Sequence, residues 1–477
     1  MKTILIDPPF YQTMGLRNRY FPYGLLSIAT SLRARGHWAI VFDGDANLRA
    51  THFDYSTMTS LYDAYLAALR ARSLPFMDAL LRMVDQHQPD VVGIHVMTTK
   101  LAAAVVLAEE LKQRFPSLDI VFGGPHVSLK SAEMSTLTSA FDTLYIGEGE
   151  HLENCLAGST PPICRQERLA LAEIPFPEPS LLVHKKSYSA EDLGLLMTSR
   201  GCPFQCAYCA TSIWKRRVRY HDVPAVVAHM EYLYHQYHVR YFAFKDDCFL
   251  LDPGRVEQFC RILAARRLRI AFECNARIEN ITPAMLRQLK RAGLRHVKVG
   301  VESGSPRVLA LMNKQQDIAA IEAAARTLHA SGIFWTAYFL IGIPGERRED
   351  AEETVALLRR IKPDFASLGV YEPFPGTELF NRGVEKGLLK ENLERDDLFT
   401  IPPNRYYMAH KDSFSDTMDA EAYRSLVREV NRLFHHYNRH LGRNVKRARS
   451  RLKLYLRSPE RLLLDARTFW SYVKGRS

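Results

Sequence analysis

Short apolar runs alternate with amphipathic patterns along the first third of the chain. Tyr23–Arg35 and Leu101–Phe115 carry apolar side chains at the spacing of helices that cover a sheet. The runs between and around them predict strands at Lys2–Asp7, Ala39–Asp43, Val91–Met97, Asp119–Gly123 and Thr143–Ile146. The alternation predicts an α/β fold, with a doubly wound, Rossmann-like parallel sheet at residues 1–155.

A second series of strands and helices follows a proline-rich stretch. This stretch contains Pro161, Pro162, Pro175, Pro177 and Pro179, and predicts an extended connector at residues 156–190. The next apolar runs predict strands at Leu195–Thr198, Tyr241–Lys245, Ile270–Asn275, His296–Val301, Trp335–Ile341 and Ala366–Tyr371. Six strand–helix units in succession predict a partial (β/α)6 barrel at residues 191–390.

The last part of the chain, residues 391–477, has a different pattern. Loop-like sequence gives way to predicted helices rich in Arg and Lys at Ala420–Leu441, Val445–Leu456 and Arg461–Tyr472. A basic helix with Phe469 and Trp470 can make a peripheral contact with an anionic membrane. It can equally cover the open side of the barrel with its charges solvated, so both interpretations stand.

Polar and glycine residues follow the predicted strands, where ligands of parallel sheets bind. In the first domain these positions are Pro8, Thr98, Gly123, Gly124, His126, Gly147 and Glu148. Glycine at such a position lets the backbone approach a flat or bulky ligand closely. A histidine at a strand end is more often a hydrogen-bonded wall residue than a metal ligand, which applies to His95 and His126.

Three cysteines form the one cluster among the eight in the chain. Cys202, Cys206 and Cys209 have the spacing C-x3-C-x2-C, and three soft thiolates on one loop suit an iron–sulfur cluster. A fully coordinated cluster has four cysteine ligands, so a set of three leaves one iron open. The alternatives are a structural zinc site or three unrelated thiols; zinc takes four ligands, and no second pair is visible.

The stretch from Gly201 to Cys209, including the aromatic Tyr208, resembles the cluster loop of the radical S-adenosylmethionine (SAM) enzymes. The resemblance implies a [4Fe–4S] cluster whose open iron chelates the amino and carboxylate groups of SAM. It further implies that electron transfer cleaves SAM to a 5′-deoxyadenosyl radical. A reductant such as flavodoxin or ferredoxin is then expected as a partner.

The ends of the barrel strands resemble the same family in its own order. The resemblance implies contacts to the SAM amino group, carboxylate, ribose and adenine, in turn, by Asp246 with Asp247, by Arg277, by Glu302 with Ser303, and by Gly342 with Gly345. Each has a plainer alternative. The two aspartates can cap a helix, Arg277 and Glu302 can pair with each other, and the glycines can simply form a turn.

The N-terminal domain resembles the cobalamin-binding domain attached to many radical SAM enzymes. Gly123-Gly124-Pro125-His126 and Gly147-Glu148-Gly149-Glu150 carry most of this resemblance. Many such domains have an Asp-x-His-x-x-Gly motif after the first strand, whose histidine ligates cobalt, whereas this chain has Asp7-Pro8-Pro9-Phe10. The resemblance implies cobalamin without a histidine ligand, or a domain that is only a scaffold. A nucleotide site is less supported, because neither G-x-G-x-x-G after the first strand nor a Walker loop is present.

Charge and hydropathy narrow the classes of substrate, partner and location that we expect for this protein. The net charge of +12 favours an anionic or lipid-linked small-molecule substrate. Nucleic acid is not expected, because the RNA-modifying relatives carry an extra N-terminal cysteine trio and a C-terminal RNA-binding barrel that this sequence lacks. The start of the chain enters a strand without a cleavage site, and no apolar run approaches about 20 residues, so we expect a cytoplasmic protein.

Together the resemblances imply a cobalamin-dependent radical SAM methyltransferase that acts on an unactivated carbon. A first alternative keeps the cofactors but catalyses ring closure, ring contraction or oxidation without methyl transfer. A remote alternative is a non-catalytic iron–sulfur protein for electron transfer or interaction. The motifs do not separate the first two possibilities.

Overall fold

A computed structural model describes residues 1–18, 20–46, 51–52, 61–156, 162–211, 217–409 and 414–440. The chain forms two compact units. The first consists of Met1–Leu193 and Glu391–Tyr407, and the second of Gly194–Lys390 and the described residues from Met408 onward. Each unit is built on its own parallel sheet.

The sheet of the first unit has six strands in the order β3-β1-β5-β6-β7-β8. They are β1 (Lys2–Asp7), β3 (Trp38–Asp43), β5 (Val91–His95), β6 (Asp119–Gly123), β7 (Thr143–Ile146) and β8 (Ile163–Arg165). All of them pair in parallel. The order reverses between β1 and β5, and right-handed crossovers on the two sides of that point place helices on opposite faces.

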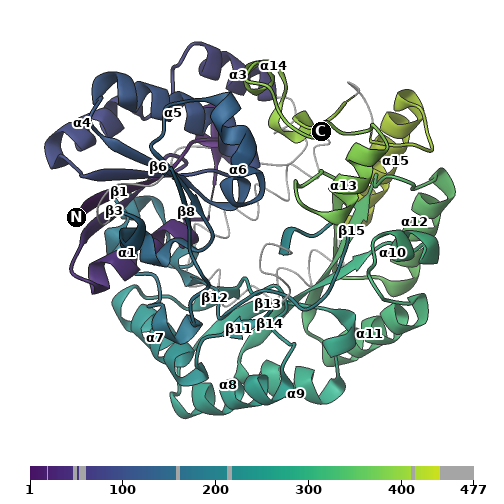
Figure 1. The fold of residues 1–477 in the computed structure, drawn as a ribbon. Helices are drawn as coiled ribbons and strands as arrows, with labels where there is room; N and C mark the ends of the chain where they lie inside the picture. The colour runs from purple at the N-terminus through teal and green to yellow at the C-terminus, as the bar shows by residue number, and fades with distance from the viewer. Residues whose placement is uncertain are drawn as a thin grey trace. The chain divides into compact units, whose positions relative to one another are not determined.

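The helices of the first unit are α1 (Tyr23–Ala34), α3 (Tyr62–Arg70), α4 (Met77–His87), α5 (Leu101–Arg114), α6 (Pro125–Leu137) and the short α14 (Asp397–Thr400). Figure 1 shows α1 and α5 on opposite sides of the strands. The segment Leu101–Ala108 of α5 is completely buried, because its alanines allow close contact with the sheet. This confirms the predicted doubly wound domain.

Two segments outside residues 1–155 belong to this unit. The predicted connector at 156–190 contributes the edge strand β8, and its Leu182 forms a bridge with Val41. Cys164 of β8 forms a disulfide with Cys155, with Cα atoms 6.0 Å apart. Glu391–Tyr407 also packs here, through hydrogen bonds that include Tyr407 with Glu133. These segments were expected in a connector and a tail. Backbone pairing brings the first to the sheet, and side-chain contacts attach the second to this unit.

The second unit has a six-stranded parallel sheet in sequential order, β16-β15-β14-β13-β12-β9. Its strands are β9 (Leu195–Leu196), β12 (Tyr241–Phe244), β13 (Ala271–Ala276), β14 (Leu294–Glu302), β15 (Phe334–Ile341) and β16 (Phe365–Val370). The helices are α7 (Val223–Gln236), α8 (Pro253–Ala265), α9 (Pro283–Ala292), α10 (Pro306–Leu311), α11 (Ile318–Ser331), α12 (Arg348–Ile361), α13 (Glu378–Glu385) and α15 (Ala420–Asn438). The predicted partial barrel is confirmed.

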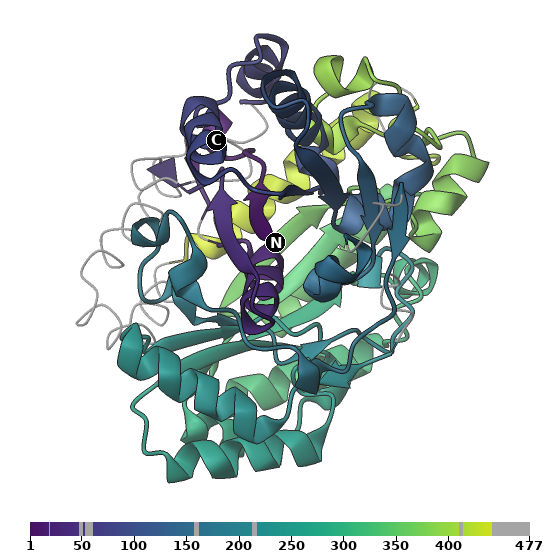
Figure 2. The same cartoon turned by 60° about the vertical axis from the view of Figure 1, so that its left-hand side comes forward.

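The helices α7 to α12 lie on the outer side of this curved sheet (Figure 1). The turned view in Figure 2 shows the teal and green strands side by side, with teal helices stacked against one of their faces. The outer face is apolar: Trp335, Ala337, Phe339 and Ile341 of β15 are buried. The alternate positions of the strands therefore point to the concave face, where Tyr338 is 37% exposed.

The first barrel strand is shorter than expected for a physical reason. The sequence predicts Leu195–Thr198, whereas β9 ends at Leu196. The backbone N–H groups of Thr198 and Ser199 donate to the carboxylate of Asp246, at 2.6 and 2.5 Å, instead of continuing the ladder. The chain then forms a small antiparallel pair, β10 (Ser199–Arg200) with β11 (Arg219–Tyr220).

The C-terminal part is described as far as residue 440. The predicted helix Ala420–Leu441 corresponds to α15, whereas those at Val445–Leu456 and Arg461–Tyr472, with Phe469 and Trp470, lie outside the described residues. A second small pair, β2 (Leu16–Arg17) with β4 (Thr51–His52), belongs to the first unit. No described helix has both the length and the apolar character needed to span a bilayer.

Candidate active site

The three-cysteine loop begins directly after β10, at Gly201, whose φ of 99° turns the chain away from the strand. Cys202, Cys206 and Cys209 are all partly exposed. Burial raises the pKa of Cys202 to about 11, and the charges of Asp247, Cys248 and Cys209 add to this effect.

The donor set suits an iron–sulfur cluster by its chemistry, because soft thiolate sulfur is the ligand that such clusters use. In the part of the chain that the structure describes, no group of three or more His, Cys, Asp or Glu side chains stands in an arrangement that could hold a metal ion. The support for the metal site at Cys202, Cys206 and Cys209 therefore comes from ligand type and spacing, and their role as ligands stays a prediction.

A loop that follows α10 holds the cysteine loop in place. Met312 accepts a hydrogen bond from the backbone N–H of Ala207 at 2.7 Å, and the Asn313 side chain donates to the Gln205 carbonyl at 3.0 Å. The carbonyl of Ala207 accepts from the N–H of Leu379 at the start of α13, at 2.9 Å. The cysteine loop is thereby fixed by elements far from it in sequence.

Arg277, which follows β13, lies against the cysteine loop; its contact with the carboxylate of SAM stays a prediction. Its guanidinium stacks on the Phe204 ring at 3.7 Å and lies 3.4 Å from the sulfur of Cys206. It also pairs with Glu279 at 2.9 Å and donates to the Lys314 carbonyl at 2.8 Å. The alternative of an Arg277–Glu302 ion pair is not what the structure has.

The two aspartates after β12 have different environments. Asp246 is completely buried, and its carboxylate accepts from the backbone and hydroxyl groups of Thr198 and Ser199. It supports the start of the cysteine loop. Burial, followed by the charge of Asp246, raises the pKa of Asp247 to about 6. Asp247 is therefore the member of the pair that remains available to a ligand.

Glu302 ends β14 and forms an ion pair with Lys314, with Nζ and Oε1 2.8 Å apart. The same ammonium group lies 3.2 Å from the hydroxyl of Tyr208 in the cysteine loop. Burial, together with the charge of Glu302, raises the pKa of Tyr208. Sequence reasoning found Glu302 and Tyr208 but missed Lys314, because Met312-Asn313-Lys314-Gln315-Gln316 has the composition of a surface loop.

The other predicted barrel residues hold the structure together around the turn after β15. Ser303 is buried and its hydroxyl lies 3.0 Å from that of Thr354 in α12. Gly342 and Gly345 have φ values of 83° and 88°, which favour glycine. The N–H of Gly342 donates to the buried carboxylate of Glu346, and burial raises the pKa of that carboxyl to about 7.

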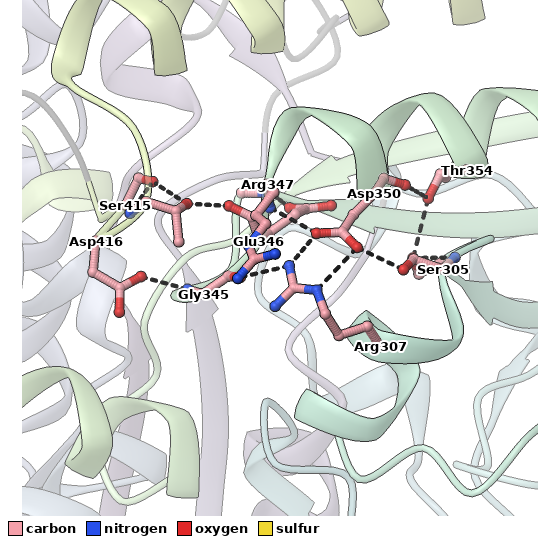
Figure 3. A network of polar contacts seen from close by, with 12 residues as sticks. Ser305, Arg307, Gly345, Glu346, Arg347, Asp350, Thr354, Ser415 and Asp416 are labelled. Carbon is pink, nitrogen blue, oxygen red and sulfur yellow. Dashed lines mark hydrogen bonds and ion pairs between the residues drawn. The ribbon is translucent and has the colours of Figure 1, made fainter.

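A polar network fastens this turn to its surroundings (Figure 3). Asp350 of α12 accepts from the Ser305 hydroxyl at 2.6 Å and pairs with Arg307, which also donates to the Gly345 carbonyl at 2.7 Å. The N–H of Gly345 donates to Asp416 at 2.6 Å. The chain that leads into α15 is thus tied to the turn after β15.

At the reversal of strand order in the first unit, a buried lysine sits among acidic side chains. The ammonium of Lys100 lies 2.5 Å from Asp7 and 2.8 Å from Asp45. Burial and the neighbouring Asp7 raise the pKa of Asp43, to which Tyr188 donates a hydrogen bond. Asp45 also accepts from the N–H of Phe10 at 2.8 Å, so the cluster pins the loop after β1 that contains Pro8.

The next strand ends are joined by a chain of polar contacts. Thr98 lies 3.0 Å from Nδ1 of His126, whose Nε2 lies 3.0 Å from Glu133. Glu133 accepts from the hydroxyl of Tyr407 at 2.7 Å. Burial alone would raise the pKa of Glu133, but these partners lower it. His126 is thereby a wall residue held by a carboxylate.

The remaining positions at this edge form tight turns of the backbone. Gly124 has a φ of 109°, and a Cβ there would lie 2.6 Å from the ring of His95. Gly123 is adjacent, and the N–H of Gly147, whose φ is 112°, donates to the Ser128 hydroxyl at 3.2 Å. Glu148 is buried beside it, and its carbonyl accepts from Tyr145.

The loops fit cobalamin in that glycines with positive φ, Gly124 and Gly147, turn the backbone tightly at the ends of the strands. The two candidate histidines are engaged elsewhere: Nδ1 of His95 lies 3.1 Å from Asp7, and His126 lies between Thr98 and Glu133. The position after β1 has Pro8 and Pro9 instead of a histidine. Binding without a histidine ligand to cobalt therefore stays the prediction for this domain.

Comparison with known proteins follows the same division of the chain. Residues 196–358 match the Radical SAM superfamily, and residues 16–156 match the B12 binding domain. An uncharacterized methyltransferase of Pyrococcus horikoshii is 30% identical over 350 residues, which cover 67% of this chain and 74% of the relative. The anaerobic magnesium-protoporphyrin IX monomethyl ester cyclase of Rubrivivax gelatinosus is 26% identical over 366 residues, which cover 68% of this chain and 65% of the cyclase.

A solved structure has the same fold. The radical S-adenosylmethionine methyltransferase TsrM from Kitasatospora setae superposes with a TM-score of 0.64 over 91% of this chain and 89% of its own, at 16% identity. The resemblance to both family parts is thus confirmed by sequence and fold. The chain belongs to the radical SAM enzymes that carry a B12-binding domain, and its cofactors are a [4Fe–4S] cluster, S-adenosylmethionine and cobalamin.

Proposed function

We propose that the protein is a cobalamin-dependent methyltransferase that acts on an unactivated carbon of a small molecule. The observation that carries the proposal is the identity of 30% to a methyltransferase over 350 residues, which cover 67% of this chain. Further relatives at lower identity include a hopanoid C-2 methylase of Rhodopseudomonas palustris and a cytidylyl-2-hydroxyethylphosphonate methyltransferase of Streptomyces wedmorensis. The substrate class we propose is an anionic or lipid-linked metabolite, in line with the net charge of +12.

When bound, the cluster with SAM supplies a 5′-deoxyadenosyl radical, and cobalamin supplies the methyl group. The chain's own residues bind and orient. We assign Arg277 to the carboxylate of SAM, because a guanidinium binds a carboxylate through two parallel hydrogen bonds. Asp247 accepts a hydrogen bond from the SAM amino group, and Glu302 accepts from its ribose hydroxyls.

The polar concave face of the barrel is the proposed place for the substrate. Glu273 on this face lies 3.1 Å from His296 and 2.5 Å from Lys298, and accepts from Tyr241 at 2.9 Å. Burial would raise the pKa of Glu273, but Lys298 and His296 hold it well below its usual range. The face thus offers a fixed set of donors and one ionised acceptor at neutral pH.

The test uses the holoprotein, purified without oxygen and loaded with cluster and cobalamin. It is incubated with reductant, SAM carrying a deuterated methyl group, and a metabolite extract of the source organism. A methyltransferase forms S-adenosylhomocysteine and 5′-deoxyadenosine together, and a metabolite gains the labelled methyl group. Formation of 5′-deoxyadenosine with no label in any metabolite and no S-adenosylhomocysteine contradicts the proposal.

A second candidate, oxidation or ring closure without methyl transfer, is supported by one observation. Three of the relatives are anaerobic magnesium-protoporphyrin IX monomethyl ester cyclases, and one is 26% identical over 366 residues of this chain. The same incubation distinguishes this candidate, because its product loses hydrogen and gains no labelled carbon. Flavodoxin or ferredoxin is the proposed reductant for both candidates.

A further inference from the structure

A buried lysine outside the residues implied by the family resemblance stands at the centre of the radical SAM site. Lys314 is 4% exposed, and its ammonium lies 2.8 Å from Oε1 of Glu302 and 3.2 Å from the hydroxyl of Tyr208. Its backbone carbonyl accepts from Arg277 at 2.8 Å. Lys314 therefore contacts Tyr208 within the cysteine loop and two residues outside it, Glu302 and Arg277.

The backbone around this contact is held in unusual conformations. Glu302, Asn313 and Gln315 have φ values of 68°, 49° and 55°, in the left-handed region that residues with a Cβ rarely adopt. The register of β14 on β15 shifts between Gly300 and Glu302. A Cβ at Gly300 would collide with the Glu302 carboxylate and lie 3.0 Å from the Lys314 ammonium. Strain of this kind gathers at functional sites, where the surrounding structure fixes it.

Stability alone does not account for the arrangement. Removing two charges from water costs several kcal/mol per ion, and apolar residues of similar volume often replace a buried ion pair without loss of stability. Here the pair also occupies strained backbone. Its Glu302 side chain stays 12% exposed, so a ligand can reach it.

We propose that Lys314 is a positioning residue for S-adenosylmethionine. Its ammonium fixes the Glu302 carboxylate, together with the Tyr208 hydroxyl, beside the cysteine loop. In that state the carboxylate accepts hydrogen bonds from the hydroxyl groups of the nucleoside. The proposal rests on the proposed use of Glu302 in binding SAM, and is independent of the fate of the substrate.

The test measures SAM affinity by equilibrium dialysis of the anaerobic holoprotein with its cluster oxidised, so that no turnover occurs. Lys314→Met is expected to weaken SAM binding at least about tenfold, whereas Lys314→Arg, which keeps the charge, stays within about threefold of the parent. Lys290→Met, which changes an exposed lysine on α9, is the control and leaves the affinity unchanged. Equal affinity of Lys314→Met and the parent overturns the proposal.

A double-mutant cycle separates positioning from general damage to the fold. Glu302→Gln and Lys314→Met remove the same interaction, so the double variant should bind SAM no more weakly than the worse single variant. Losses that add up fully overturn the proposal. Glu302→Gln preserves the size of the side chain and Lys314→Arg preserves its charge, so the test survives if Lys314→Met does not fold. Failure of the parent itself to bind SAM with a complete cluster would instead contradict the proposed function.

Discussion

The two parallel sheets gather charged side chains at the carboxyl ends of their strands, but they use them differently. In the first unit, Lys100 is enclosed by Asp7, Asp43 and Asp45 and forms ion pairs with Asp7 and Asp45. In the second unit, Arg277 and Lys314 are directed to the cysteine loop, at Cys206 and Tyr208. The charges around Lys100 stabilise a loop of the first unit. Arg277 and Lys314 instead lie beside the loop that we expect to bind the cluster.

The difference follows from what each ligand needs. A wide corrin ring is expected to bind through shape and backbone, and glycines such as Gly124, where a Cβ would meet His95, allow the tight turns at the strand ends. SAM carries an ammonium and a carboxylate that need charged partners within reach. The histidines of the first unit are likewise paired within the unit, since His95 and His126 both lie against carboxylates of its own residues.

The largest effect is expected from Cys206→Ala. Loss of one of three thiolates removes the cluster, and SAM cleavage falls to background, because SAM has no iron to bind. Cobalamin binding by the first unit should remain. Iron and sulfide analysis, 5′-deoxyadenosine formation and the ultraviolet–visible spectrum of bound corrin measure the three quantities. Turnover that persists in this variant contradicts the assignment of the cluster loop.

Lys100→Met is expected to act on the other unit. It leaves three buried carboxyl groups without their cation, and breaking a buried pair in this way costs about 3–5 kcal/mol of unfolding free energy. Denaturant unfolding measures the loss, and cobalamin affinity should fall with it. Lys2→Met, at an exposed position of β1, is the control. A variant as stable as the parent would show that the cluster is not ionised.

Much of this contrast could be predicted from the sequence, because strand ends are marked by abrupt changes of residue type. The runs Lys2–Asp7, Asp119–Gly123 and Thr143–Ile146 end where an acid or a glycine follows β-branched and aromatic residues, and the strands have the same bounds in the structure. The cysteine spacing and Arg277 were likewise recognisable, because each keeps its place relative to a strand.

Other parts depend on contacts that no local pattern reveals. β8 has three residues, of which only Cys164 is buried, so its sequence carries no strand signal. Glu391–Tyr407 joins the first unit through single side chains such as Glu133 and Tyr407. Lys314 lies in a polar segment where burial depends on the distant Glu302. Long-range pairing determines all three.

Glu346→Gln should produce a moderate, pH-dependent effect. The pKa of Glu346 is raised by burial from 4.5 to about 7, so the folded state binds a proton that the unfolded state releases between these values. Stability therefore falls as pH rises through this window, by up to about 3 kcal/mol in total. Glutamine remains uncharged and abolishes this fall.

Urea unfolding at about pH 5 and about pH 8, on either side of the window, measures the change for the parent and the variant. Glu353→Gln, at an exposed position of α12, is the matched control and should keep the slope of the parent. The unfolding free energies of the parent and of Glu346→Gln should approach each other at the lower pH, where the Glu346 carboxyl is protonated. An equal change in unfolding free energy between the two pH values for the parent and Glu346→Gln would mean that the Glu346 carboxyl does not titrate in this window.

The smallest effect is expected from Tyr423→Phe. It tests whether the second unit contains a buried polar group that contributes neither to stability nor to SAM binding. The Tyr423 hydroxyl of α15 is buried beside Gly342 and has no hydrogen-bond partner among the described residues. Removing an unpaired buried hydroxyl is neutral or slightly stabilising, within about 1 kcal/mol, and SAM affinity should not change. Thermal unfolding and equilibrium dialysis measure both. A clear loss of SAM affinity would instead show that this hydroxyl forms a hydrogen bond when SAM is bound. The polar groups of the second unit that contact SAM would then include one from α15.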